Sequence, residues 1–227
     1  MNKLKVQTAD ISSEAEWDYR ESAPIWRKAT FDPFPGYAHD EKTVQDLLLH
    51  LSMVWEPSHE ITFFLPNREE TGRTNGWSMM QQSNGEWIED AEEKSGWRWE
   101  PQEDTGDIVF SAKRVPPMRA MTRHLVGHEY GHHVEWMINK ARGNDYFSNS
   151  LRDEYLKMRG LSPDLHKHYG TGGRWHSSIH EIFACDFRIV LCGYETEHWP
   201  HEGIAHPLKN ATVIAWWLEA QEWWATR

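Results

Sequence analysis

The stretch "HLVGHEYGHHVEW", residues 124–136, holds four histidines and two glutamates within thirteen residues. His128 and His132 are one helical turn apart, so a helix would place both imidazoles on the same face. Glu129 is rotated by about 100° from His128 and would flank the point that both rings face. This H-E-x-x-H spacing is typical of a helix that offers two ligands to Zn²⁺ and a glutamate as general base.

The flanking residues predict that this motif lies on one long helix, within residues 115–144. Pro116 and Pro117 suit its first turn, and Gly143 followed by Asn144 suits its end. Apolar and motif residues recur at steps of three and four on one face: Met118, Met121, Leu125, His128, His132, Trp136 and Asn139. Gly127 and Gly131 lie on a neighbouring face, where the lack of a side chain would let another element approach closely.

A catalytic zinc ion usually takes three protein ligands and leaves one position for water. The predicted helix at residues 177–193 offers Glu181, at the edge of a buried face that is formed by Ile179, Ile182, Phe183, Phe187 and Val190. Histidines compete for this role, so a three-histidine site stays open: His176, His180, His198, His201 and His206. His124 and His133 are not spaced to join His128 and His132.

The two motifs together resemble a known family. "HEYGH" (128–132) followed by "EIFACDF" (181–187) resembles the gluzincin metallopeptidases, and most of all the catalytic domains of anthrax lethal factor and the bacterial Pro-Pro endopeptidases. In these proteins the third-ligand helix carries E-x-F-A-E-x-F, which Glu181, Phe183, Ala184 and Phe187 match. The spacing of 49 residues between His132 and Glu181 (181 − 132) is also similar. The resemblance covers residues 106–192.

The resemblance implies a zincin-like α+β metallopeptidase that hydrolyses peptide bonds with Zn²⁺. It implies His128, His132 and Glu181 as metal ligands, with Glu129 as the general base. Two positions depart from the family. Cys185 stands where the family has an acid that can orient a ligand histidine, and Asp186 follows it.

The second departure concerns the family's oxyanion-stabilising tyrosine. Tyr169, in "HYGTGG" (168–173), lies further upstream of Glu181 than the family tyrosine does. A glycine-rich loop could still bring its phenol to the metal, and the alternative is an ordinary surface tyrosine.

We expect a single domain over residues 1–227, with a small antiparallel or mixed sheet packed on the motif helix. Residues 1–105 form its α+β part, and residues 106–227 its metal-binding, mainly helical part. Helices are predicted within residues 40–57, 149–160 and 206–227, and strands at 61–66 and 106–112. Trp77, Trp87 and Trp97 lie ten residues apart beside glycines, which suggests a small antiparallel meander. The strand at 106–112 is the predicted edge beside which an extended substrate peptide binds.

Charge and hydropathy limit the partners. The net charge of −11 argues against nucleic acid or an anionic membrane as the main partner, because both need a cationic surface. A local basic group reads as the solvated start of a helix: Lys113, Arg114, Arg119 and Arg123. The first residues contain no apolar run that is long enough for a signal peptide, and no stretch approaches the ~20 apolar residues of a membrane span. We therefore expect a cytoplasmic protein whose partner is a protein or peptide substrate.

The only two cysteines, Cys185 and Cys192, fall on the predicted Glu181 helix. Seven residues of helical rise separate their Cα atoms by about 10 Å, too far for a disulfide. We expect free thiols that play no part in catalysis.

Two other functions compete with a zinc endopeptidase. One is a catalytically inactive or regulatory zincin-fold protein that keeps the metal and serves as an interaction module. The other is a histidine-rich structural protein that binds no metal.

Overall fold

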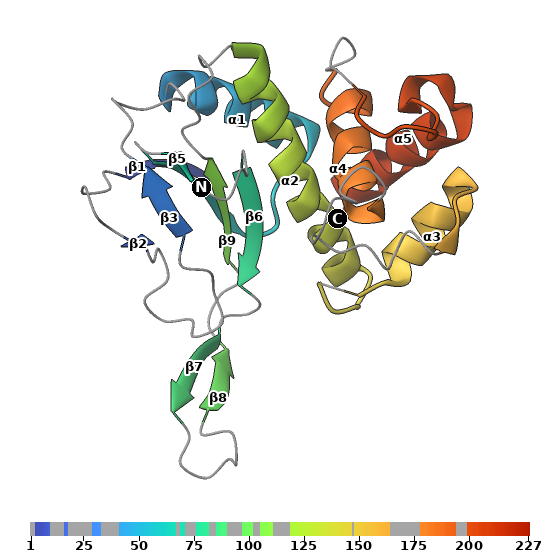
Figure 1. Ribbon diagram of the computed structural model, residues 1–227. Helices are drawn as coiled ribbons and strands as arrows, with labels where there is room; N and C mark the ends of the chain where they lie inside the picture. The colour runs from blue at the N-terminus through green and yellow to red at the C-terminus, as the bar shows by residue number, and fades with distance from the viewer. Residues whose placement is uncertain are drawn as a thin grey trace. The chain divides into compact units, whose positions relative to one another are not determined.

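The computed structural model describes residues 3–9, 16–17, 29–32, 41–66, 69–70, 76–81, 85–89, 97–101, 105–110, 119–146, 148–163, 178–193 and 199–227 (Figure 1). Several residues named above lie outside this part of the chain: Lys113, Arg114, Pro116, Pro117, Met118, Tyr169, His176 and His198. The chain splits into two compact units, one of Met1–Gln45 and Ser58–Thr122, the other of Asp46–Pro57 and Arg123–Arg227. Residues 46–57, expected in the N-terminal part, therefore belong to the second unit.

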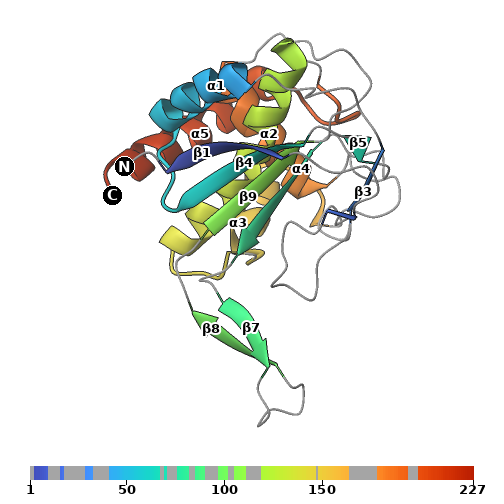
Figure 2. The same cartoon turned by 90° about the vertical axis from the view of Figure 1, so that its left-hand side faces the viewer.

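The first unit contains a four-stranded mixed sheet with the order β1 (Leu4–Ala9), β4 (Glu60–Pro66), β9 (Thr105–Phe110) and β6 (Gly76–Gln81). β1 and β9 both run parallel to β4, and β6 runs antiparallel to β9 (Figure 2). Ile61, Phe63 and Leu65 alternate along β4 and are all buried, as expected for a strand with one face on a core. The fold is thus mixed α+β. The predicted strand at 61–66 is confirmed, and the one at 106–112 is confirmed as far as Phe110, because residues 111–112 lie outside the described part of the chain.

The position of β9 corrects one expectation. This strand was predicted to be an exposed edge, but it lies between β4 and β6 and pairs with both. Both hydrogen-bonding sides of β9 are therefore used, and no peptide can add beside it. Within the described part of this sheet, β1 and β6 are the edges.

The three tryptophan-bearing segments do form strands, but not one meander. Trp77 lies on β6, whereas Trp87 on β7 (Gly85–Glu89) and Trp97 on β8 (Trp97–Pro101) belong to a separate antiparallel pair. β6 pairs with the distant β9 in place of β7. The equal spacing of the three tryptophans predicted the strands correctly. It predicted the wrong pairing partner for β6, the strand that carries Trp77. A further small sheet joins β2 (Glu16–Trp17), β3 (Ala29–Asp32) and β5 (Glu69–Glu70).

Helices build the second unit. They are most of α1 (Glu41–Val54) and α2 (Arg119–Ala141), then α3 (Ser150–Arg159), α4 (Ile179–Val190) and α5 (Ala211–Ala225), with a short 3₁₀ turn at Pro207–Lys209. The five α-helices of the described ranges lie where the sequence predicts them. None of the described helices combines the length and apolar character that a membrane crossing needs.

Large aromatic side chains form the core of the second unit. Trp55, Phe187 and Trp217 pack edge to face or tilted, with ring centroids 5.7–6.5 Å apart. Tyr130 donates a hydrogen bond of 2.7 Å from its hydroxyl to the Trp55 carbonyl, which joins α2 to the end of α1. Trp217 donates from its indole nitrogen to the Tyr155 hydroxyl at 2.9 Å. The Tyr130 hydroxyl and the Trp217 indole nitrogen thus find acceptors inside the core, as is usual for buried Tyr and Trp. The buried indole nitrogen of Trp55 has no hydrogen-bond partner among the described residues.

The end of α2 has a local cause. Gly143 has φ +78°, a left-handed conformation that glycine adopts without steric cost. The Gly143 amide donates to the Lys140 carbonyl at 2.9 Å, and the Asn144 amide donates to the Asn139 carbonyl at 3.0 Å. These two bonds form a Schellman motif, which stops the helix as the Gly143-Asn144 pair predicted.

Candidate metal centre

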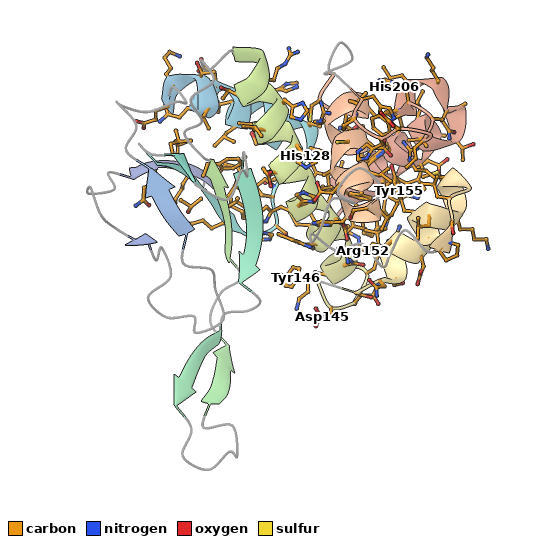
Figure 3. All side chains as sticks on the ribbon, in the orientation of Figure 1. His128, Asp145, Tyr146, Arg152, Tyr155 and His206 are labelled. Atoms are coloured by element: carbon orange, nitrogen blue, oxygen red, sulfur yellow. The ribbon has the colours of Figure 1, made fainter. Side chains whose placement is uncertain are left out.

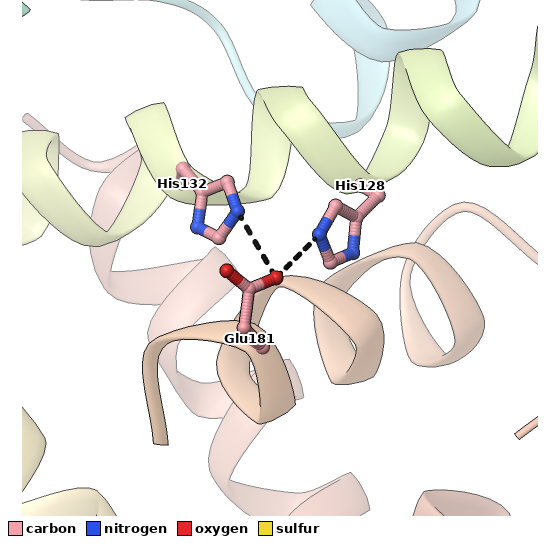
Figure 4. Close-up of side chains that lie close together, drawn as sticks. All are labelled: His128, His132 and Glu181. Carbon is pink, nitrogen blue, oxygen red and sulfur yellow. Dashed lines mark hydrogen bonds and ion pairs between the residues drawn. The ribbon is translucent and has the colours of Figure 1, made fainter. Parts of the chain in front are cut away.

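The centre begins with two histidines on α2. The His128 and His132 rings lie one helical turn apart with their centroids 4.8 Å apart, and only 4% and 5% of the two residues is exposed. Both rings turn toward the same side of the helix (Figure 4). Glu129 lies between them in sequence and is also buried.

A close helix crossing brings α4 to these histidines. A Cβ atom added to Gly131 would lie 2.8 Å from the Ala184 Cα atom and 3.0 Å from its carbonyl oxygen. No real side chain tolerates such a distance, so the two backbones can approach this closely only because residue 131 is glycine. The expectation of a close approach at Gly131 is therefore confirmed, and the partner is the helix that carries Glu181.

Glu181 completes the cluster from the first turn of α4. Its Oε2 atom lies 2.9 Å from His128 Nε2 and 3.6 Å from His132 Nε2 (Figure 4). One ligand atom from each of the three residues lies within 4.8 Å of the others. The structure thus brings together all three residues that were predicted as metal ligands.

The spacing of these atoms fits a metal ion. Four ligands placed tetrahedrally at about 2.0–2.1 Å from zinc lie about 3.3–3.4 Å from one another. The two distances to Glu181 Oε2, 2.9 and 3.6 Å, lie on either side of that value. Two imidazole nitrogens and a carboxylate oxygen are also the donor types that such ions take in proteins. His128, His132 and Glu181 could therefore hold a metal ion with little movement.

The electrostatics of the cluster reflect burial and mutual contact. Burial lowers the pKa of His128 to about 3, although the hydrogen bond to Glu181 opposes this, so the ring is neutral. Burial also acts to lower the pKa of His132, but the nearby carboxylates, led by Glu181, outweigh it and raise the pKa. Burial would raise the pKa of Glu181, yet the two histidines hold it well below its usual range. The carboxylate is thus ionised and ready to bind a cation.

A second buried cluster adjoins the first. Glu135, one turn beyond His132 on α2, accepts a hydrogen bond of 2.5 Å from the Arg152 Nε of α3. Its other oxygen lies 2.5 Å from His180 Nδ1 of α4. Glu135 is fully buried and its pKa is lowered to about 2, because His180 and Arg152 together outweigh the effect of burial. One carboxylate thereby links α2, α3 and α4. Its partner from α3, Arg152, is labelled in Figure 3.

This second cluster is not arranged as a metal site, although His132, Glu135 and His180 also have ligand atoms within 4.8 Å of one another. The His132 and His180 rings are stacked, with centroids 3.8 Å apart and planes 22° from parallel. An imidazole binds a metal in the plane of its ring, and stacked rings point their lone pairs side by side. The Arg152 guanidinium, already paired with Glu135, would also repel a cation. In this cluster the His180 ring instead packs against the His132 ring, and Glu135 holds His180 in that position.

Sequence reasoning missed this support. Glu135 falls three residues after His132, so helical spacing is the signal that could have placed it near that face. His180 was one of the histidines that competed with Glu181 as third ligand, and its ring faces Glu135 and His132. No signal in the sequence identified Arg152 as the partner of Glu135, because the way in which α3 packs against α2 depends on the tertiary structure.

Cys185, which departs from the family pattern, and the Asp186 that follows it face different neighbours. Asp186 pairs with Arg159 at 2.5 Å and accepts a hydrogen bond from the Tyr155 hydroxyl, both on α3. It therefore does not orient a ligand histidine. Cys185 faces α2 instead, with its Sγ atom 3.4 Å from His128 Nδ1.

The other candidate residues do not join the cluster. His124 stacks on His128 at a centroid distance of 6.1 Å, and His133 is buried against Trp136. Within the described ranges, the groups able to hold a metal include neither His201 nor His206. Tyr169, His176 and His198 lie outside those ranges, so the role assigned to Tyr169 stays a prediction.

Comparison with known family models, with curated proteins and with solved structures finds no match to this chain.

Proposed function

We propose that this protein is a zinc-dependent endopeptidase. The observation that carries the proposal is the convergence of His128 Nε2 and His132 Nε2 on one oxygen of Glu181, with Glu129 beside them. The cluster alone supports a metal ion of some kind. The H-E-x-x-H spacing adds the choice of zinc and the assignment of hydrolysis.

In this proposal each side chain has one task. A zinc ion held by His128, His132 and Glu181 would act as a Lewis acid and lower the pKa of a water molecule. Glu129 accepts the proton of that water as its oxygen attacks the peptide carbonyl carbon, and the carbon–nitrogen bond then breaks. Glu129 returns the proton to the leaving nitrogen, so acid and amine products balance the added water. Tyr169 is the predicted donor to the oxyanion.

The placement of Glu129 supports its role as general base. It precedes His132 by three residues, and its carboxylate is close enough to help raise the pKa of that histidine. Glu129 is buried, so its proton transfers would take place away from bulk water. A buried carboxylate at a metal-bound water is the usual form of a general base in such sites.

The finer family assignment belongs to the same proposal. The gluzincin order, with H-E-x-x-H on one helix and the third ligand on a later one, agrees with the positions of α2 and α4. A zincin fold, in which the sheet packs on the motif helix, stays a prediction from the resemblance. So do a protein or peptide substrate and a cytoplasmic location.

The test compares wild type with Glu129→Gln, each loaded with one equivalent of zinc. Glutamine keeps the shape of the side chain but cannot accept the proton. We expect Glu129→Gln to retain zinc and to cleave a broad peptide library about 10²–10⁴-fold more slowly, the usual contribution of a general base. Cleavage is read by mass spectrometry, and zinc by elemental analysis after dialysis.

Glu222→Gln on α5 is the matched control, because Glu222 is exposed and lies on another helix. It should cleave like wild type. Equal rates for Glu129→Gln and wild type would remove the assigned role. Stoichiometric zinc without any cleavage by wild type would instead favour the inactive, zinc-binding interaction protein, and no zinc at all would favour a structural protein.

A further inference from the structure

The His128 ring is held by α4 on both of its nitrogens. Its Nε2 atom faces Glu181, and its Nδ1 atom lies 3.4 Å from the Sγ atom of Cys185, within hydrogen-bond range for sulfur. Glu181 and Cys185 are four residues apart, so one face of α4 presents both groups to the same imidazole. Cys185 is fully buried.

Metal binding fixes the direction of the hydrogen bond at Nδ1. If Nε2 gives its lone pair to a metal, the proton of the neutral ring must reside on Nδ1. A buried N–H group without an acceptor costs about 1–3 kcal/mol. The sulfur of Cys185 is in position to accept this bond, so it stabilises the tautomer that binds metal.

The surroundings of the sulfur agree with an acceptor role. Arg188 lies one turn further along α4 and donates from Nη2 to Cys185 Sγ at 3.7 Å. Sulfur can accept through more than one lone pair, so both donors can use it at once. The neighbouring carboxylate of Asp186 is engaged by Arg159 and Tyr155 of α3. The group that meets His128 Nδ1 from α4 is therefore a thiol.

We propose that Cys185 is a positioning residue for the metal centre, which accepts a hydrogen bond from His128 Nδ1 and keeps Nε2 directed at the metal. This inference rests on the proposed metal site. It differs from the expectation that neither thiol plays a part in catalysis, because it gives Cys185 a role at the metal centre and gives Cys192 none. Cys192 lies beyond the end of α4, where its backbone carbonyl oxygen is 3.3 Å from His50 Nε2.

The expected effect follows from similar arrangements. Loss of the group that orients a ligand histidine typically weakens metal affinity about 10–100-fold. A thiol sulfur is a weak acceptor, so we expect the lower end, about tenfold, for Cys185→Ala. The effect should be on affinity and tautomer rather than on folding alone.

The experiment measures the zinc dissociation constant by competition with a chromophoric chelator. Cys192→Ala is the matched control, because it removes the same thiol from a buried site on the same segment. We expect Cys185→Ala to bind zinc about tenfold more weakly than wild type, and Cys192→Ala to bind like wild type. Cys185→Ser keeps an acceptor and should recover most of the affinity.

Urea unfolding of the metal-free variants separates positioning from packing, since both alanine variants lose a buried group. A second readout is the ¹⁵N spectrum of the imidazoles in the zinc-loaded protein, where wild type should carry the His128 proton on Nδ1. Wild-type affinity in Cys185→Ala, or equal losses in both alanine variants, would overturn the inference while leaving the metal site intact. Absence of zinc binding by wild type would instead overturn the proposed function.

Discussion

Glu181 is the residue on which the His128 and His132 imidazoles of α2 converge. It is 15% exposed at its side chain, so its charge has lost most of its hydration. A buried carboxylate needs compensation by a cation or by hydrogen bonds. In the metal-free protein the two histidines supply this, and in the loaded protein the ion would.

Replacement of Glu181 by Ala should therefore abolish tight metal binding. Structural zinc sites bind with about 10–16 kcal/mol shared among four ligands, so loss of one ligand should weaken binding by about 10²–10³-fold. Zinc content per chain after dialysis measures this. His201→Ala is the control, because His201 is a buried histidine outside the cluster and should retain full zinc. If Glu181→Ala kept its zinc, the third ligand would have to be a histidine.

His180 adjoins Glu181 in sequence, but it packs against a ligand histidine and is not itself a proposed ligand. Its ring stacks on His132 and its Nδ1 faces Glu135, so its removal should disturb the support of His132 rather than remove a ligand. The sequence left His180 open as a competing third ligand, and in the structure its Nδ1 atom lies 2.5 Å from a Glu135 oxygen. The neighbours of His180 include Arg152 of α3, and the sequence could not predict where α3 packs.

At the scale of elements, the centre depends on how closely α2 and α4 cross. The contact of Gly131 with the Ala184 backbone sets the distance between His132 and Glu181. On α2, Gly131 immediately precedes His132, and on α4, Ala184 lies one turn after Glu181. A wider crossing would separate the ligands on the two helices.

Gly131→Ala should therefore weaken both the fold and the metal site. The new Cβ would meet backbone atoms that cannot rotate away, and overpacking of this kind costs about 1–3 kcal/mol of unfolding free energy. Zinc affinity should fall as well, because Glu181 moves with α4. Urea unfolding of the metal-free protein and chelator competition measure the two effects.

Gly143→Ala distinguishes the crossing from the general cost of losing a glycine. Gly143 has open space around its Cβ position but a positive φ, so alanine there costs about 1–2 kcal/mol through strain alone. This variant should lose stability and keep its zinc affinity. Equal zinc affinities in Gly131→Ala and wild type would show that the crossing does not position the ligands.

The whole chain consists of two compact units, and all three proposed ligands belong to the one made of Asp46–Pro57 and Arg123–Arg227. The mixed sheet belongs to the other unit. A metal that binds only the native form stabilises it by about 2.7 kcal/mol when its free concentration is 100 times the dissociation constant. This stabilisation should be larger for the unit that holds the proposed ligands than for the unit that holds the sheet.

We expect zinc to slow amide hydrogen exchange in peptides from residues 123–141 and 178–193. Peptides from β4 in the other unit should change much less, because no proposed ligand lies there. Exchange followed by mass spectrometry, with and without zinc, measures this. The Glu181→Ala variant should show no zinc effect. Equal protection of both units would mean that they unfold together or that the metal binds elsewhere.

The sequence by itself was enough to predict the helices and two of the three proposed ligands. The α-helices of the second unit follow from local signals: apolar spacing of three and four residues, the Gly143 and Gly160 ends, and Asn210, which caps α5 by accepting from the Thr212 and Val213 amides. His128 and His132 needed only the geometry of one helix. Glu181 needed the resemblance as well, because nothing local relates two helices 49 residues apart.

Only the tertiary structure decided which groups surround the ligands and how the strands pair. Cys185 rather than Asp186 meets His128, and Arg152 balances Glu135, because helix packing sets which side of α4 faces α2 and which faces α3. β9 became an interior strand because β6, distant in sequence, pairs with it. Local sequence patterns determine secondary-structure propensity and which residues share one face of a helix or strand. Strand partners and buried ion pairs depend on contacts between residues far apart in the chain.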